Sequence, residues 1–501
     1  MLGKRVKFGL WALVVLVLSA CYRPQVQPAV QFPLSFAATP MPTVTPRDPT
    51  VPLTPTPLVP RQAPSALTVY HTVAYGETLT GIAQTYGTTV EALLALNGIA
   101  NADQLAVGQR LQITQAVSDV GPEYRLIPDS ELVYGPAYAD FDIEAVTAAY
   151  PGWFNEYSEE LDGRLHSASE IVEKVALQYS VGPRVLLTLL ELRSGWLTNP
   201  DPSPQARLYP LGYEREYWEG LYLQLGWVAS ALNAGFYGWH TESLWTLQLA
   251  NGEYVQLAPT LNAGTVGVQC ALTAGLDAET WHALLNPATP DGFSAVYRSL
   301  FGDPFYYAIE PLLPPGDAPE LALPWPVGET WYLTGGPHGG WDAGSAWAAV
   351  DFVPDGDQLG CYQSRAWVTA VAPGTILYSD DGLVLQTLED GRFLGAGWLM
   401  IYMHVAREGR VSVGAVVDTG DRIGHPSCEG GVSSGTHLHF ARRYNGVWIA
   451  ADNPQWPLIL DGWRAASSGT PYNGTLTRDG QVRTACQCRE PSNAIQHTGS
   501  P

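Results

Sequence analysis

The sequence predicts a chain of several domains: a small βααβ module, a mainly α-helical middle domain and a mainly antiparallel β domain at the C-terminal end. The length of 501 residues exceeds the roughly 100–200 residues of one domain. Apolar residues recur at helical spacing in the first two parts, whereas short β-branched and aromatic runs separated by turn residues fill residues 321–476. Apolar residues make up 46% of the chain, which is enough to build real cores.

The composition is acidic and rich in aromatic residues. There are 26 Lys and Arg against 48 Asp and Glu, a formal net charge of −22. Nucleic acids and anionic lipid surfaces select basic patches, so we exclude nucleic acid as a partner. Few charges together with 17 Trp and 25 Tyr are typical of an extracytoplasmic protein that handles polymers.

Residues 1–20 have the form of a secretory signal, because three basic residues precede an apolar run over 8–18. That run is shorter than the about 20 residues of a membrane-spanning helix. It ends in Leu18-Ser19-Ala20-Cys21, which resembles the lipobox of bacterial lipoproteins. The resemblance implies lipid attachment at Cys21 and an exported protein anchored to a membrane of the cell envelope. An ordinary signal peptide with a chance cysteine is the alternative.

Residues 21–67 are rich in Pro and Thr and predict a tether. The segment Pro52-Leu53-Thr54-Pro55-Thr56-Pro57 excludes both a helix and a central strand. Such segments favour extended polyproline II geometry and act as semi-rigid spacers. The tether would hold the folded part of the protein away from the membrane.

Residues 68–115 predict a strand, two short helices and a returning strand. We expect helices over about 78–86 and from Thr88 or Thr89 to Asn97, with left-handed glycines at their ends, and a second strand over 105–113. The unit resembles a LysM domain over its full length, on residues Tyr70, Val73, Gly76-Glu77-Thr78-Leu79, Ile82-Ala83, Tyr86-Gly87, Leu96-Asn97 and 108–111. The resemblance implies binding to glycan that contains N-acetylglucosamine, usually peptidoglycan.

Residues 120–320 predict a helical domain. Ser167-Ala168-Ser169-Glu170 is a capping-box pattern, Gly182-Pro183 opens a further helix, and aromatic-rich helices are expected over 217–236 and after Asn262. Residues 179–200 distantly resemble the start of a lysozyme-like lytic transglycosylase. Arg193 stands where that family has its acid, and Glu191 lies on another side of the helix. We therefore interpret the domain as a transglycosylase-like remnant without catalysis.

Residues 321–476 carry the residues that predict chemistry, and residues 477–501 are taken as a tail. His437 and His439 are two apart on a predicted strand, so both imidazoles face one cleft. His404 lies inside a second predicted strand, 399–406, and Asp351 in an apolar third. Two histidines, a third histidine and an aspartate from neighbouring strands can build a zinc site, and a catalytic zinc needs three protein ligands and an open position.

These motifs resemble the lysostaphin/LytM-type zinc metallopeptidases, which cut peptide bonds in peptidoglycan. The resemblance covers about 324–462 and includes the segments 367–374, Val413-Gly414, Thr419-Gly420-Asp421-Arg422-Ile423-Gly424 and Gly435-Thr436-His437-Leu438-His439-Phe440. It implies that Asp351 and His439 bind one Zn²⁺. It also implies that His404 and His437 are the catalytic pair.

One position departs from that family's pattern. The family places its first ligand histidine four residues before the aspartate, where this chain has Trp347, which cannot bind zinc. His338 is the substitute we expect, because a turn at the end of the preceding strand could carry its imidazole to the same cleft. A surface His338 and an inactive site are the alternative.

Two pairs of cysteines support two further predictions. Cys361 and Cys428 fall in loops of the β domain and could form a disulfide, as an oxidising compartment allows. Cys486 and Cys488 lie in the predicted tail and could bond to one another only with strain, or to another chain.

The sequence therefore favours a membrane-anchored peptidoglycan hydrolase, a zinc metalloendopeptidase that cuts peptide cross-links while LysM binds glycan. The alternative is a catalytically degenerate LytM-type activator of cell-wall amidases, which would be a glycan-binding regulator with those enzymes as partners. The retained ligand positions favour the enzyme.

Overall fold

The computed structural model describes residues 60–61, 67–74, 76–101, 105–106, 108–115, 120–356, 358–391 and 393–499. All of these residues belong to one unit of the chain, 52–501, and the other unit is 1–51. The signal segment, Cys21 and all but three residues of the tether lie outside the described residues. Among the residues described, no helix combines the length and the apolarity needed to cross a bilayer.

The N-terminal module has the predicted βααβ order. Its elements are β1 (Leu67–Thr72), α1 (Leu79–Thr85), α2 (Val90–Asn97) and β2 (Arg110–Gln115). β1 pairs antiparallel with β2, and Thr89 caps α2 by accepting from the amide of Ala92 at 3.1 Å. β2 starts later than the predicted residue 105, because a turn closed from Gln109 N–H to Ala106 O, with Gly108 at φ 84°, precedes it.

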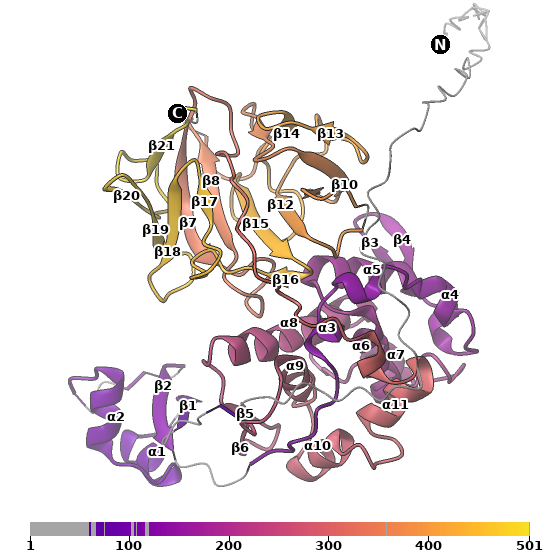
Figure 1. Cartoon of the computed structure of the whole chain (residues 1–501). Coiled ribbons are helices and arrows are strands. Elements are labelled where there is room, and N and C mark those ends of the chain that lie inside the picture. The colour runs from indigo at the N-terminus through magenta and orange to yellow at the C-terminus, as the bar shows by residue number, and fades with distance from the viewer. Residues whose placement is uncertain are drawn as a thin grey trace, which may run out of the picture. The chain divides into compact units, whose positions relative to one another are not determined.

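The middle domain is mainly helical, as predicted (Figure 1). Its helices are α3 (Asp129–Leu132), α4 (Ile143–Thr147), α5 (Ala168–Tyr179), α6 (Pro183–Ser194), α7 (Pro204–Leu208), α8 (Leu221–His240), α9 (Ala263–Ala271), α10 (Ala278–Leu285) and α11 (Phe293–Phe301). The domain also contains two hairpins that were not expected from the sequence, β3 (Ser158–Leu161) with β4 (Arg164–Ser167) and β5 (Thr246–Gln248) with β6 (Tyr254–Gln256).

Local signals explain where the two central helices begin and end. The capping box at the start of α5 is complete, since Ser167 Oγ accepts from the Glu170 amide and the Glu170 carboxylate accepts from the Ser167 amide. Ser180, at φ 58°, ends α5 in the left-handed conformation. α8 starts at Leu221 rather than at the predicted 217, because Gly220 has φ 96° and cannot continue a helix.

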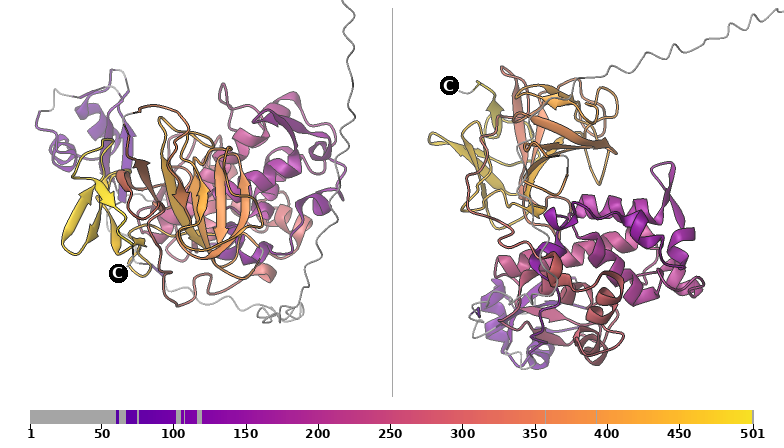
Figure 2. Two further views of the ribbon diagram at one scale, coloured as in Figure 1. Left: turned by 90° about the horizontal axis from the view of Figure 1, so that it is seen from above. Right: turned by 45° about the vertical axis from the view of Figure 1, so that its right-hand side comes forward.

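The C-terminal domain is built on a large antiparallel sheet in the order β13-β10-β11-β12-β15-β8-β7-β21, with β16 paired to β15. The strands are β7 (Thr330–His338), β8 (Ala349–Pro354), β10 (Gly374–Asp380), β11 (Leu383–Thr387), β12 (Trp398–Met403), β13 (Val416–Val417), β15 (Leu438–Tyr444), β16 (Val447–Trp448) and β21 (Ala494–Gln496). Figure 2 shows the orange strands of this sheet side by side in two further views. β9 (Val368–Thr369) and β14 (Arg422–Gly424) form a separate pair.

The segment predicted as a tail is instead part of the β domain. A second sheet has the order β17 (Ile459–Leu460), β18 (Trp463–Ser467), β19 (Gly474–Arg478) and β20 (Gln481–Thr484). After it, β21 pairs with β7 of the large sheet, which places Ile495 in the core. The prediction failed because strands this short leave little periodicity for sequence analysis to detect.

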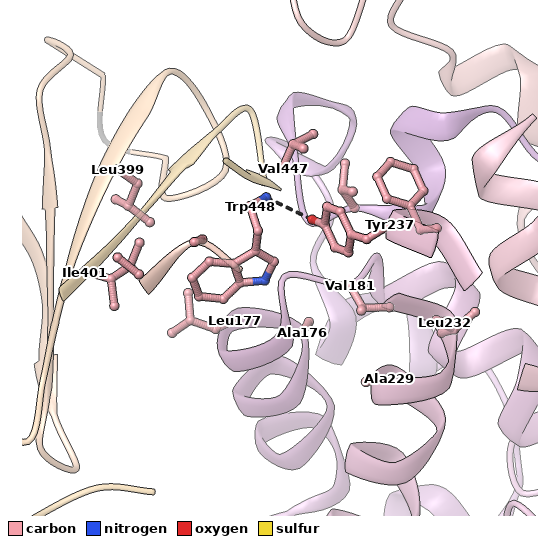
Figure 3. Packing of buried hydrophobic residues seen from close by; sticks show 14 of the residues in the cluster. Ala176, Leu177, Val181, Ala229, Leu232, Tyr237, Leu399, Ile401, Val447 and Trp448 are labelled. Atoms are coloured by element: carbon pink, nitrogen blue, oxygen red, sulfur yellow. Dashed lines mark hydrogen bonds between the residues drawn. The ribbon is translucent and has the colours of Figure 1, made fainter. Parts of the chain in front are cut away.

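The middle domain and the β domain share one apolar core. Trp448 of β16 is 2% exposed and packs beside Leu177 of α5 and Tyr237 of α8 (Figure 3). The Trp448 amide donates a hydrogen bond of 2.9 Å to the Tyr237 hydroxyl, and the indole N–H donates to Tyr179 O at 3.1 Å. The two domains are therefore joined by a packed and hydrogen-bonded interface.

Candidate functional site

Three neighbouring strands bring His338, Asp351 and His439 together. His439 lies opposite Asp351 in the pairing of β15 with β8. His338 is the last residue of β7, and register shifts on both sides of Gly335 turn the end of that strand toward the same site. The strand irregularity, rather than the expected turn after the strand, therefore delivers the His338 imidazole.

The three side chains form a compact triangle of ligand atoms. His338 Nε2 lies 3.1 Å from His439 Nδ1 and 3.3 Å from Asp351 Oδ1, and His439 Nδ1 lies 3.2 Å from Asp351 Oδ1. Tetrahedral zinc with bonds of about 2.0–2.1 Å holds its ligand atoms about 3.3 Å apart. The triangle therefore has the size that a zinc ion requires.

Hydrogen bonds decide which ring nitrogen of each histidine faces the triangle. His338 Nδ1–H donates to Gly336 O at 2.8 Å, which leaves Nε2 free. His439 Nε2–H donates to Gly340 O at 2.9 Å, which leaves Nδ1 free. Backbone carbonyls that fix the tautomer and the ring orientation in this way are typical of metal-binding histidines.

Asp351 is buried with an unsatisfied oxygen. Its Oδ1 has no hydrogen-bond partner among the described residues, and it points at the two free imidazole nitrogens. Burial opposes ionisation, but the neighbouring imidazoles outweigh it and hold the pKa of this carboxyl well below its usual range. A buried, ionised and unpartnered carboxylate oxygen is costly unless a cation binds it. The donor set therefore fits a divalent metal.

Gly335 makes room for this carboxylate. A Cβ built on Gly335 would lie 2.4 Å from Asp351 Oδ2, closer than real Cβ atoms approach an oxygen. Only glycine therefore allows β7 and the Asp351 side chain to approach this closely.

His404 and His437 face each other beside the triangle, with ring centroids 4.4 Å apart. Each has Nδ1 bonded to a backbone carbonyl, Glu429 O at 3.0 Å and Gly435 O at 2.8 Å respectively, so each has Nε2 free. Burial and the two neighbouring histidines lower the pKa of His404 to about 3. The His404 imidazole is therefore neutral near neutral pH, and its free Nε2 can accept a hydrogen bond.

The backbone around this pair differs from the prediction. The strand expected over 399–406 ends at Met403, and His404 takes φ 65°, a conformation that residues other than glycine rarely adopt. The Ser427 amide and hydroxyl both donate to His404 O and hold it there. His437 likewise precedes β15 instead of lying within it. Strain of this kind is common at functional sites.

All five of these residues line one cleft, whose volume is about 960 Å³. The Cys361–Cys428 disulfide, which is the predicted pairing, joins two loops that also contribute residues to the lining of this cleft. Trp347 lies in the wall of the cleft. The third corner of the ligand triangle is His338. Cys486 and Cys488 bond to each other, and Cys488 also lines the cleft.

Five aromatic residues of this cleft were not predicted from the sequence: Tyr179, Tyr222, Trp341, Tyr362 and Tyr472. Tyr472 stacks on His338 with centroids 4.1 Å apart. Trp341 follows His338 by three residues, and Tyr179 and Tyr222 come from the middle domain. A tyrosine or tryptophan outside a recognised motif carries no sequence signal for a site, so only the fold could identify these residues.

Glu191, the carboxylate weighed as a catalytic remnant, has a local role. It accepts from the amides of Leu197 and Thr198, at 2.8 and 3.3 Å, and from the Thr198 hydroxyl. It therefore holds the loop after α6.

Family models match three stretches of the chain. The LysM domain matches residues 71–114, the LasA N-terminal domain residues 125–314, and peptidase family M23 residues 355–451. The second match assigns the helical domain to a LasA family rather than to the lytic transglycosylases. The match to peptidase family M23 begins after both His338 and Asp351 in the sequence.

Curated relatives and solved structures resemble the same regions. Protease LasA of Pseudomonas aeruginosa strain UCBPP-PA14 is 27% identical over 343 residues, which cover 64% of this chain and 74% of LasA. Beta-lytic metalloendopeptidase of Lysobacter enzymogenes is 26% identical over 174 residues, 32% of this chain and 90% of that protein. The structure of the M23 metalloprotease pseudoalterin from the deep sea has 25% identity and a TM-score of 0.28, over 33% of this chain and 94% of that one.

Together with the order of the strands and helices, the three family matches identify the parts of the molecule. The chain combines a LysM domain, a helical LasA N-terminal domain and a C-terminal domain of peptidase family M23.

Proposed function

We propose that the protein is a zinc metalloendopeptidase that cuts peptide cross-links of peptidoglycan, with His338, Asp351 and His439 as the zinc ligands. The triangle of free ligand atoms, with sides of 3.1–3.3 Å and a buried, unpartnered carboxylate oxygen, carries this proposal. The M23 match and the protease relatives support the reaction class. Bound zinc would act as a Lewis acid on the scissile carbonyl and lower the pKa of water.

The residues beside the ligands supply proton transfer and hydrogen bonding. His404, neutral and with Nε2 free, accepts a hydrogen bond from the attacking water and orients it. His437 Nε2, also free, lies 3.7 Å from Asp351 Oδ1 at the edge of the triangle; it takes the proton of that water and then, as the imidazolium, donates to the negatively charged carbonyl oxygen. The pair thus orients the water, accepts its proton and then stabilises the oxyanion.

The other parts of the chain determine where this enzyme acts. The LysM match supports glycan binding by residues 71–114, and peptidoglycan is the partner that both end domains favour. Lipid at Cys21 and the 21–67 tether would keep the enzyme at a membrane of the cell envelope. Tethering raises the local concentration of substrate, so modest affinity of each module is enough.

The test is zinc content and hydrolysis of purified peptidoglycan, measured on the full chain with His338→Ala, His439→Ala and, as a control, His282→Ala in the middle domain. We expect one zinc per wild-type chain with release of free amino groups, and loss of both in the first two variants only. One zinc retained in His338→Ala would contradict the assigned ligand set. No zinc in metal-replete wild type would refute the peptidase.

A further inference from the structure

A single arginine lines the cleft, and the proposed chemistry does not use it. Among the described residues of the cleft, Arg489 is the one Lys or Arg. It lies between β20 and β21, in the β domain that also supplies the ligand triangle. Lys174 of α5 lies near the cleft residue Tyr222, but its ammonium is already paired with the carboxylates of Asp381 and Asp162. Arg489 is therefore the cation that this cleft offers to a substrate.

Strand β8 runs from the ligand triangle to this arginine. Asp351 and Val353, two apart on β8, both line the cleft, so the cleft follows this face of the strand. The Arg489 Nε–H donates at 3.1 Å to the carbonyl of Pro354, the last residue of β8. Three residues of strand span about 10 Å. The guanidinium therefore lies about three residues along the strand from the ligand aspartate.

Buried hydrogen bonds hold the loop that carries Arg489. Asn493 is fully buried, and its side-chain amide donates to Cys488 O at 2.9 Å and to Leu333 O of β7 at 3.0 Å. The Cys486 amide also donates to Leu333 O, and the Cys486–Cys488 disulfide closes the turn. The backbone just before Arg489 is thus fixed to the large sheet before any substrate binds, which reduces the entropy lost on binding.

The guanidinium keeps most of its donors for a ligand. Of its five N–H groups, Nε–H bonds to Pro354 O and one Nη2–H reaches Gln358 O at 3.5 Å. Asp355, which follows Pro354, accepts from the Tyr332 hydroxyl at 3.4 Å, and no ion pair holds Arg489 among the residues that the structure describes. The planar fork of Nη1 and Nη2 can therefore bind both oxygens of a carboxylate.

The charges around the cleft favour an anionic group at this position. The chain has a formal net charge of −22, so most of its surface repels anions. Besides the metal ligand Asp351, the described cleft residues include one acid, Asp342, whose carboxylate bonds to the Ser230 hydroxyl and the Gly344 amide. A carboxylate on the substrate is thus attracted at Arg489 and repelled elsewhere.

We propose that Arg489 is a specificity-determining residue that binds a free carboxylate of the peptide substrate, about three residues from the bond that is cut. An extended peptide advances about 3.3 Å per residue, so this spacing matches the path along β8 from Asp351 to Arg489. The inference rests on the proposed peptidase function and adds to it a preference for peptides that carry a negative charge.

The test compares two substrates on the zinc-loaded full chain: a cross-linked stem-peptide dimer with free carboxylates, and the same dimer with its carboxylates converted to carboxamides. We expect kcat/KM to be about tenfold higher for the first dimer, through KM. Arg489→Gln should remove this preference by weakening only the first dimer. Arg464→Gln, which removes the same charge from an exposed arginine of β18 outside the cleft, should retain it.

Calorimetric titration of each dimer gives a readout that needs no turnover, and we expect the same tenfold difference in Kd and its loss in Arg489→Gln. Neither dimer carries glycan, and the LysM domain is unchanged in every variant. Should Arg489→Gln fail to fold, by zinc content and thermal midpoint, Arg489→Lys is the second variant; it keeps the charge but not the fork and should lose part of the preference.

The outcomes separate this inference from the peptidase proposal. Wild type that cuts both dimers without preference would overturn the role of Arg489 and leave the peptidase intact. Equal losses on both dimers in folded Arg489→Gln would also overturn it, because they would show that the arginine only holds its loop. Wild type that binds the first dimer more tightly through Arg489 but cuts neither would overturn the peptidase alone. Neither cleavage nor a difference in Kd would overturn both.

Discussion

At the scale of single residues, the site depends on atoms that approach unusually closely. Gly335 is the clearest case, since any side chain there would displace the Asp351 carboxylate. Tyr472 is another, because its ring covers the face of His338 and limits how that imidazole can move. Residues that contact ligands in this way affect the metal site nearly as strongly as the ligands themselves.

Gly335→Ala should weaken zinc binding by about 10–100-fold, because the new methyl group pushes Asp351 Oδ2 out of place. Competition with a chromophoric zinc chelator measures this affinity. Gly316→Ala is the matched control, since a Cβ there meets nothing within 4 Å. Equal zinc affinity in the two variants would show that Asp351 does not hold the metal in this position.

At the scale of elements, the stability of helix α5 depends on the hydrogen bonds that cap its first turn. Ser167→Ala removes the capping hydrogen bond to the Glu170 amide and should lower the free energy of unfolding by about 1 kcal/mol. Denaturant unfolding of the full chain checks this value. Ser169→Ala, in the same turn but outside the capping box, should change it by less than about 0.5 kcal/mol.

The end of the chain should make stability depend on pH. His497 follows β21, and its Nε2 lies 3.0 Å from Asp461 Oδ2 while Nδ1–H donates to Trp325 O. Burial alone would lower the pKa of His497, but these two partners outweigh it and raise the pKa. The folded state therefore binds the proton more tightly than the unfolded state.

Protonated His497 contributes its full stabilisation below the pKa of an unfolded-state histidine, about 6.5. That contribution is lost as the pH rises through the higher pKa of the folded state. We expect the thermal midpoint of unfolding to decrease as the pH rises from about 6 to about 8. His497→Gln should remove the part of this decrease that His497 causes. His282→Gln, at a histidine without an ion-pair partner among the described residues, should keep the wild-type profile. An identical profile in His497→Gln would refute the assignment.

At the scale of the whole molecule, the helical and β domains should unfold together. Arg443→Met leaves two carbonyls at the end of α5 without their charged donor and should cost about 3 kcal/mol. Denaturant unfolding followed by tryptophan fluorescence should then separate into two transitions. Exposed Arg464→Met should leave a single transition. A single, unshifted transition in Arg443→Met would show that this contact does not couple the domains.

The site was predictable to the extent that its residues follow strand periodicity or a motif. Asp351, His404, His437 and His439 were found in this way, and the structure brings all four together. His338 was only a candidate from the sequence, because nothing in its spacing shows that the register shifts around Gly335 turn it inward. The left-handed backbone conformation of His404 could not be predicted, since Ser427, which holds it by hydrogen bonds, comes from another loop.

By itself, the sequence determined the local elements and the order of the domains: the capped helices, the βααβ module and the antiparallel β domain all depend on residues close together in the chain. Only the tertiary structure decided which atoms complete the ligand triangle, that β21 belongs to the large sheet, and that Tyr179 and Tyr222 reach the cleft of another domain. These features depend on contacts between separate segments of the chain, and such contacts leave no periodic pattern in the sequence.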